Sequence, residues 1–419
     1  MTRTGNSGIR ASLPLVLLLF TGGADQCGLA LQSLEIPAGT TIHLRLETPV
    51  ASNVSRPGEK VRAVVTSPVA SGEQVLLPAG AIIHGAVTQA QLIDETHEQA
   101  MLGIDFGELE GREGRRAQLS ARITGVDNAR ESVDEAGRII GILPAQTITN
   151  RIDQALGRLG TRYESLAAVL LGVKQAFLKE AQPEIVYPAG TEMTVQLSTP
   201  LVLASAFSGG TVPAGTAGKP DNSLEDLVNS QPFETMAEDP PRPSDLTNLM
   251  FLGTEAAIAQ AFKAAGWSTA AELSAASKME TVRAVLEARG YSEAPVSLLL
   301  LDGRKPDLVF QKQLNTFAKR HHLRVWRRPG DYGGQPVWVS AATHDIDIEF
   351  SAENRTFIHK IDSDIDRERA KVVADLRFTG KVSEVFMIER PGVPRETKNA
   401  TGDALITDGK IAVVVLAPQ

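Results

Sequence analysis

Four of the seven histidines in the chain lie between positions 321 and 359, in a stretch that is also rich in carboxylates. Imidazole and carboxylate groups together form the usual ligand set for zinc, iron or manganese, and they also serve in general acid and base catalysis. Either chemistry requires that several of them share one site. These residues are His321, His322, His344, His359, Asp345, Asp347, Glu349, Asp362, Asp364 and Asp366.

The first two histidines come directly before a predicted strand, 323–327. Alternation along a strand predicts that His322, Arg324 and Trp326 project from one face. Two interpretations stay open. This face could hold an anionic or sugar-like ligand through charge-assisted hydrogen bonds and stacking, or it could be a solvated sheet edge whose basic residues prevent edge pairing.

A second predicted strand, 337–350, places the carboxylates of its part 343–350 on one side and the apolar residues, together with His344, on the other. His359 ends a third predicted strand and is the best single candidate for a ligand or acid/base residue. The acidic run that follows it does not fit a calcium loop, because Arg367 and Val373 occupy the positions of the required glycine and glutamate. We predict instead that Ser363 and Asp366 form a capping box.

Standard catalytic motifs are missing from the sequence. No Gly-x-Ser-x-Gly segment occurs, residues 215–219 lack the spacing of a phosphate-binding loop, and Met101 stands where a zinc protease needs its second histidine after His97. With Cys27 as its single cysteine, the chain cannot form a cysteine-based zinc site or an internal disulfide. The sequence therefore assigns no catalytic residue, metal ligand or cofactor, and leaves enzymatic activity undecided.

The length and charge of the chain bound the remaining possibilities. Its 419 residues, 42% hydrophobic and 22% charged, are enough for two or three packed domains. A formal net charge of −8 argues against a general nucleic-acid binder, which needs a basic face.

The N-terminus shows the three-part pattern of a secretory signal. Arg3 and Arg10 precede the apolar run 13–20, and small residues follow as far as Ala24 or Ala30. Because the apolar run is too short to span a bilayer as a helix, we expect residues 1–30 to be a signal peptide and the mature protein to be exported to the bacterial periplasm or cell envelope. A retained membrane anchor is the alternative.

One sequence motif occurs twice in the first half, at 36–49 and 187–200. Each copy has Pro-Ala-Gly-Thr near its start and continues with alternating apolar residues. This alternation is typical of half-buried strands, and more such runs separate the copies. His43 falls on the polar face, level with Thr194 of the other copy. We therefore expect residues 31–218 to form a β-barrel or sandwich.

Apolar residues recur every three or four positions over 151–181, which predicts a long helix, or a helical hairpin broken near Gly160, inserted into this β-domain. It is expected either to pack on the barrel wall or to contact a partner or a membrane surface. Residues 219–244, rich in proline and acidic residues, are expected to be a linker. Residues 245–419 predict an α+β domain with an antiparallel or mixed sheet.

Five segments of this second domain resemble the LssY C-terminal domain, a bacterial domain without an established activity. They read Ala261-Phe-Lys-Ala-Ala-Gly-Trp267, Pro306-Asp-Leu-Val-Phe-Gln-Lys312, Arg320-His-His-Leu-Arg-Val-Trp326, Pro336-Val-Trp-Val-Ser-Ala-Ala342 and His359-Lys-Ile-Asp-Ser-Asp-Ile-Asp-Arg-Glu-Arg369. The resemblance implies one polar pocket. Its residues are His321, His322, Arg324, His359, Asp362 and Asp366, to which the strand pattern adds Trp326.

The Pro-Ala-Gly-Thr openings, the segments 59–65 and 77–80 and the late helical insertion make residues 34–218 similar to exported envelope β-barrels of the TrbI type. Two functions follow as expectations. The first is an envelope binding or scaffold module for an envelope protein or a small anionic ligand. The second is a metal- or histidine-dependent hydrolase of a phosphorylated or lipid-like envelope substrate. An oligomerisation role for the insertion in a secretion complex is a third, weaker interpretation.

Overall fold

The computed structural model of the chain describes residues 33–71, 74–111, 114–161, 182–204, 220–238, 240–270, 296–316, 318–351 and 356–418, with isolated positions 165, 168, 170, 171, 174, 283 and 287. Residues Ser33–Gln419 form one compact unit. The expected signal peptide, residues 1–30, lies outside the described residues.

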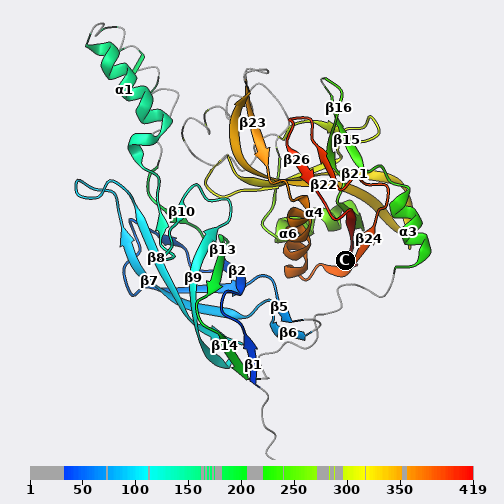
Figure 1. Ribbon diagram of the computed structural model, residues 1–419, viewed down its shortest axis with the longest axis horizontal. Helices are drawn as coiled ribbons and strands as arrows, with labels where there is room; N and C mark the ends of the chain where they lie inside the picture. The colour runs from blue at the N-terminus through cyan, green and yellow to red at the C-terminus, as the bar shows by residue number, and fades with distance from the viewer. Residues whose placement is uncertain are drawn as a thin grey trace, which may run out of the picture. The chain divides into compact units, whose positions relative to one another are not determined.

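The first half folds as a closed six-stranded β-barrel (Figure 1). Its strands pair antiparallel in the order β8-β7-β4-β2-β13-β9, and β9 pairs with β8 to close the circle. The barrel strands are β2 (Thr41–Leu46), β4 (Lys60–Val65), β7 (Ile82–Gln91), β8 (Met101–Glu110), β9 (Arg116–Val126) and β13 (Glu192–Leu197). Shorter strands accompany them: β1 (Ser33–Ile36), β3 (Val50–Ala51), β5 (Val69–Ser71), β6 (Gln74–Leu77), β10 (Ser132–Val133), β11 (Ile139–Ile140), β12 (Val186–Tyr187) and β14 (Leu201–Ala204).

The two copies of the repeated sequence motif form strands β2 and β13, which lie side by side. Thr194 pairs with His43, as the alternation predicts, and Thr194 Oγ1 lies 3.4 Å from His43 Nδ1. The glycine before each strand, Gly39 or Gly190, has a positive φ and donates its N–H to the end of the other copy's strand, at Leu197 or Leu46. Glycine is needed there because other residues adopt this conformation at a steric cost.

The helical insertion begins with a short 3₁₀ turn, η2 (Pro144–Gln146), and helix α1 (Ile148–Gly160). Lys174 Nζ lies 2.7 Å from Asp153 Oδ2. A straight helix would separate positions so far apart by about 30 Å. Lys174 therefore lies beside α1, in agreement with the hairpin alternative. Most of residues 162–181 lie outside the described residues.

The segment expected to be a linker, residues 219–244, contains regular structure. It holds helix α3 (Asn222–Asn229), capped by Asp221, and strands β15 (Glu234–Ala237) and β16 (Arg242–Leu246). The expectation of an unstructured connection was wrong because the apolar residues Leu224 and Val228 are spaced one helical turn apart and are buried. Strands β15 and β16 form a small sheet with β19 (Leu299–Leu300).

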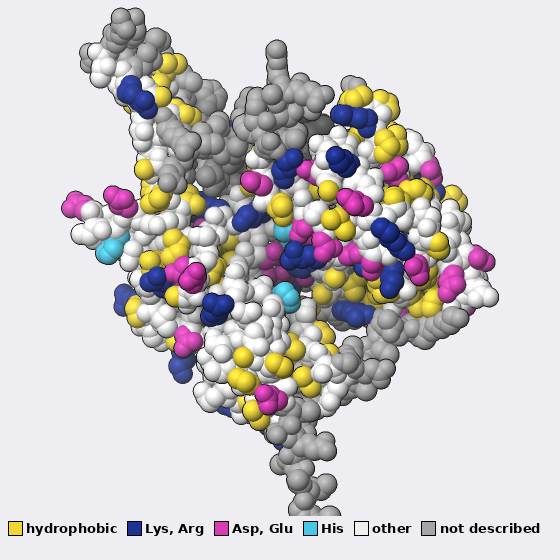
Figure 2. Space-filling model, viewed as in Figure 1, with side chains coloured by type: hydrophobic (Ala, Val, Ile, Leu, Met, Phe, Trp, Pro, Cys, Tyr) yellow, Lys and Arg dark blue, Asp and Glu magenta, His cyan; other side chains and the backbone are white. Residues whose placement is uncertain are grey.

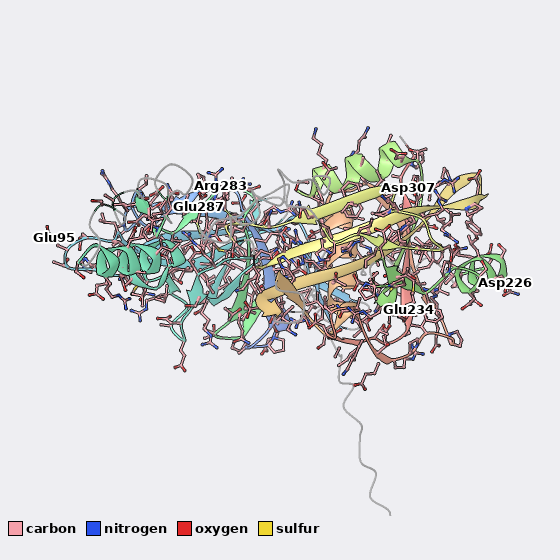
Figure 3. All side chains as sticks on the ribbon, turned by 90° about the horizontal axis from the view of Figure 1, so that it is seen from above. Glu95, Asp226, Glu234, Arg283, Glu287 and Asp307 are labelled. Atoms are coloured by element: carbon pink, nitrogen blue, oxygen red, sulfur yellow. The ribbon has the colours of Figure 1, made fainter. Side chains whose placement is uncertain are left out.

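The second half is built on an eight-stranded mixed sheet, in the order β18-β20-β21-β22-β17-β27-β24, with β23 paired to β22. Only β17 and β27 are parallel within this sheet, and the long strands β21 and β22 run side by side (Figure 3). The strands are β17 (Leu249–Leu252), β18 (Ser268–Thr269), β20 (Leu308–Lys312), β21 (Arg320–Tyr332), β22 (Gln335–Ser351), β23 (Thr356–Ile361), β24 (Val382–Glu389) and β27 (Lys410–Leu416). A separate hairpin joins β25 (Glu396–Lys398) and β26 (Ala404–Ile406).

Both faces of this sheet are covered, by different elements. Helices α4 (Glu255–Ala264) and α6 (Ile365–Phe378) pack on the face that carries Leu323 and Val325. Helix α3 packs on the opposite face, where Trp326 is buried. The expected α+β class with a barrel before it is therefore confirmed. None of the helices in the described part of the chain has the length and apolar character needed to cross a membrane.

Candidate functional site

Strand β21 divides the predicted site residues between the two faces of the sheet. His321 lies on the face of α4 and α6, where its ring stacks on that of His344 at a centroid distance of 4.1 Å. His322, Arg324 and Trp326 lie on the opposite face, as alternation predicts. The structure therefore does not bring the seven predicted residues into one pocket.

His321 is held between two carboxylates. Its Nδ1 lies 2.7 Å from Glu368 Oε2 of helix α6, and its Nε2 lies 3.1 Å from both oxygens of Asp127, which follows barrel strand β9. Burial lowers the pKa of His321, but Glu368 and Asp127 outweigh burial and raise that pKa to about 10. His321 is thus an imidazolium that links the barrel to the C-terminal sheet.

The neighbouring histidine has the opposite character. Burial, reinforced by the positive charge of His321, lowers the pKa of His344 to about 4. Its Nε2 lies 2.9 Å from Asn128 Oδ1, so the neutral ring can donate a hydrogen bond to this amide. Asn128 has a φ of 53°, a left-handed conformation that asparagine tolerates better than most residues, and this turn directs both Asp127 and Asn128 toward the sheet.

Next to this cluster, four side chains form a closed ring of alternating charge, which we call the charge ring. Lys312 Nζ lies 2.7 Å from Glu192 and 2.9 Å from Asp375; Lys371 Nζ lies 2.7 Å from each of the same two carboxylates. Glu192 belongs to barrel strand β13, and the other three to β20 and α6. Arg45 of the barrel adds a further bond to Glu192. The ring therefore joins the two halves of the unit.

The ring and the histidine cluster are partly open to solvent. Asp127 and Lys371 are about one quarter exposed, at 25% and 24%, whereas Glu368 and Asp375 are buried. Charged and histidine side chains gather in a hollow on the face of the molecule seen in Figure 2. A small ion or polar group could reach the Asp127 carboxylate from solvent.

A different cluster lies on the opposite face, centred on Asp345, which is 1% exposed. Its carboxylate accepts from Arg320 Nε at 2.7 Å, lies 3.0 Å from His322 Nε2 and lies 3.3 Å from His359 Nδ1. Burial raises the pKa of Asp345, but these surrounding groups outweigh burial and hold that pKa well below its usual range. Burial lowers the pKa of His359 to about 4, against the attraction of Asp345.

The other two predicted residues of β21 have structural partners. Arg324 Nη1 lies 3.1 Å from Asp245 Oδ2, and its Nε donates to the carbonyl of Ser297. Trp326 is 1% exposed and donates its indole N–H to the carbonyl of Arg304. The indole face of Trp326 is therefore buried in the core rather than open for a ligand to stack on.

Asp362 and Asp366 lie at the start of α6 and make local contacts. The N-cap of this helix is Asp364, whose side chain accepts from the N–H of Asp366, so the expected capping box of Ser363 with Asp366 was wrong. Asp366 accepts from Thr407 Oγ1 and from the N–H of Asp408, and thereby ties the helix to the loop before β27. Asp362 pairs with Arg367 at 3.3 Å.

Sequence reasoning missed most of the charged residues between barrel and sheet. One signal was available in α6, where Glu368, Lys371 and Asp375 recur at helical spacing beside the apolar residues Val372 and Leu376. Charged residues so close to a buried stripe indicate partners in another element. No comparable signal marks Asp127 or Glu192, because their partners are distant in sequence.

Comparison with known proteins gives three results. Residues 231–411 match the family model described as LssY C-terminus. No curated protein matches the chain. Among solved structures, ComB10 of the Com type IV secretion system of Helicobacter pylori is similar at 17% identity and a TM-score of 0.23, over 40% of this chain and 90% of that one.

The family match covers all five segments that carry the sequence resemblance, the last of which ends at residue 369. It continues through α6 and into β27. It begins at residue 231, inside the segment expected to be a linker, and so includes β15 and β16. The matched range contains every residue of the charge ring except Glu192. It also contains both histidine-containing clusters, except for Asp127 and Asn128 of the barrel. Residues 231–411 of this chain are therefore similar to the LssY C-terminus family.

Proposed function

We propose that this protein is an exported cell-envelope scaffold, in which a β-barrel and an LssY C-terminal domain act as one rigid body that presents a surface to an envelope partner. The charge ring carries the proposal. Its two carboxylates and two lysines come from both halves and are mostly buried. Moving the halves apart would therefore separate several buried charges from their partners.

Further bonds across the same junction support a rigid connection. Asn128 donates to the carbonyl of Lys312, the N–H of Arg130 donates to Asn315, and Lys319 donates to the carbonyl of Ala129. Leu314 of the C-terminal domain packs against the barrel core. A scaffold needs this property, because a fixed relation between two modules fixes the spacing of whatever each module contacts.

Hydrogen exchange of the full chain tests the rigid-body part of the proposal. If the halves act together, the slowest amides of β2 and of β22 will exchange through the same global opening, with equal free energies. In the double variant Glu192→Gln with Asp375→Asn, the exchange free energies of β2 and β22 should differ. Clearly different free energies in the unaltered protein would contradict the proposal.

Export is tested separately, by expressing the full chain in a bacterial host and fractionating the cells. We expect the periplasmic or envelope fraction to contain a mature protein that begins after Ala24 or Ala30, identified by its intact mass. The matched control carries Leu17→Arg and Leu18→Arg in the apolar run, and should remain in the cytoplasm at full length. Full-length protein found only in the cytoplasm without these changes would contradict export.

A second function, a histidine-dependent hydrolase, is favoured by one observation: His322 and His359 converge on the same carboxylate, Asp345. His359, whose side chain is 20% exposed, would be the acid/base residue. Hydrolysis of p-nitrophenyl phosphate by the full chain, lost in His359→Gln and kept in His97→Gln, would support this function. If His359→Gln and His97→Gln hydrolyse p-nitrophenyl phosphate at equal rates, a hydrolase function of His359 on this substrate is excluded.

A further inference from the structure

We propose that Asp127, His321 and His344 bind a divalent transition-metal ion, zinc being the best match, at the junction between the barrel and the C-terminal domain. Each residue offers one ligand atom, and the three atoms lie within 4.8 Å of one another. Two imidazoles and one carboxylate form a common ligand set for zinc, with the remaining position left for water. This inference is independent of export and of the scaffold function.

The surroundings of His321 resemble those of a metal-bound histidine. Metal-binding histidines usually donate their second ring nitrogen to a carboxylate or carbonyl, which fixes the tautomer and aims the other nitrogen at the metal. Glu368 Oε2, at 2.7 Å from Nδ1, fills that role, and Nε2 then faces the Asp127 oxygens at 3.1 Å. Binding would release the Nε2 proton to water and leave the Nδ1 proton on the histidine.

The second oxygen of Glu368 adds an independent observation. Glu368 is 3% exposed, and its Oε1 is buried without a hydrogen-bond partner among the residues that the structure describes. Buried carboxylate oxygens are rarely left in this state, because desolvation without a partner is costly. The protein groups around His321 thus leave a buried polar atom for which a metal-bound water is a suitable partner.

Charge and access also fit a divalent ion. Lys371 Nζ is 4.0 Å from Asp127, but it is neutralised by Glu192 and Asp375 at 2.7 Å. The two positive charges of the ion would therefore be balanced by the carboxylates of Asp127 and Glu368. Because Asp127 is 25% exposed, an ion can reach the site from solvent without unfolding the junction.

Elemental mass spectrometry of the full chain, purified without a histidine tag, is the direct test. After exposure to zinc and exhaustive dialysis, we expect about one zinc per chain. Asp127→Asn and His344→Gln should each lower the bound zinc at least tenfold, because even loss of an outer-shell partner commonly lowers metal affinity about 10–100-fold. The matched control is His322→Gln, which changes the adjacent histidine on the other face and should leave the zinc content unchanged.

Cobalt provides a readout that does not depend on any variant. Co²⁺ added to the unaltered protein should give visible absorption typical of a site with nitrogen and oxygen ligands, and zinc should displace it. Circular dichroism would show whether each variant folds. Absence of bound zinc and of the cobalt spectrum in the unaltered protein would overturn the proposal, as would zinc retained equally by folded Asp127→Asn.

Discussion

His321 and His322 are neighbours in sequence, yet they belong to two charge clusters of different construction on opposite faces of one sheet. Around His322, one carboxylate among the residues that the structure describes, Asp345, contacts three nitrogen-bearing partners. In the charge ring near His321, each lysine contacts two carboxylates, and each carboxylate contacts both lysines. The first cluster depends on one residue, whereas the second has redundant partners, so we expect them to respond differently to the loss of one charge.

The largest effect is expected for Asp345→Asn. This change removes the carboxylate charge that pairs with the buried Arg320 guanidinium at 2.7 Å, and breaking a buried pair from one side typically costs about 3–5 kcal/mol. Urea unfolding followed by tryptophan fluorescence measures the loss, since all three tryptophans lie in the C-terminal domain. A loss below about 1 kcal/mol would show that Asp345 is not the centre of its cluster.

The matched change in the charge ring, Asp375→Asn, should cost less. Both lysines keep Glu192 as a partner, and the amide oxygen can still accept from Trp267, so we expect a loss of about 1–3 kcal/mol. The same urea titration gives the value. If Asp375→Asn destabilises the protein as much as Asp345→Asn, the ring has no redundancy and the contrast between the clusters is lost.

The pH dependence of stability sharpens the contrast further, through His359. Its folded pKa of about 4 lies below the ordinary histidine pKa of 6.5, so the unfolded chain binds the proton more readily and stability falls as the pH drops through this window. Among the described residues, the charged and titratable groups that act on His359 are Asp345, Arg320 and His322. Relative to His359→Gln, the unaltered protein should lose up to about 3 kcal/mol more between pH 7 and pH 4.

Urea unfolding of both proteins at several pH values measures this difference, and the comparison removes the contribution of other groups that titrate in the same range. Parallel stability curves for the two proteins would show that His359 keeps its proton affinity on folding. That result would also remove His359 as a candidate acid/base residue of altered pKa.

The smallest effect is expected outside both clusters, for Arg367→Ala. Its pair with Asp362 has a guanidinium side chain that is 74% exposed, and such pairs contribute less than about 1 kcal/mol. Urea unfolding should therefore show a shift close to the error of the measurement. A large shift would mean that Asp362 has a role in stability that its described contacts do not explain.

Local patterns in the sequence predicted much of the fold. Alternation located the barrel strands and the long strands of the C-terminal sheet. The repeated Pro-Ala-Gly-Thr motif indicated β2 and β13, which are paired in the structure. Helical spacing over 151–181 predicted the helical insertion, of which α1 is described. These features could be predicted because each depends on residues close together in the chain.

The candidate site could be predicted only in part, for the same reason. Alternation separated His321 from His322 correctly, but nothing local indicates that His321 meets Asp127, almost two hundred residues earlier. The expectation of one pocket treated nearness in sequence as nearness in space. In a two-faced sheet, adjacent residues point in opposite directions, and the partner elements that cover each face decide which charges meet.

Strand β13 has a further consequence for how the chain is made. It pairs with β2 and β9, so a nascent chain that ends before Glu192 has an open barrel with two unpaired edges, which are prone to pair with other chains. Glu192 is also the barrel's contribution to the charge ring. Synthesis of this one strand therefore both completes the barrel and supplies the carboxylate on which the later half can dock, which favours folding from the N-terminus to the C-terminus.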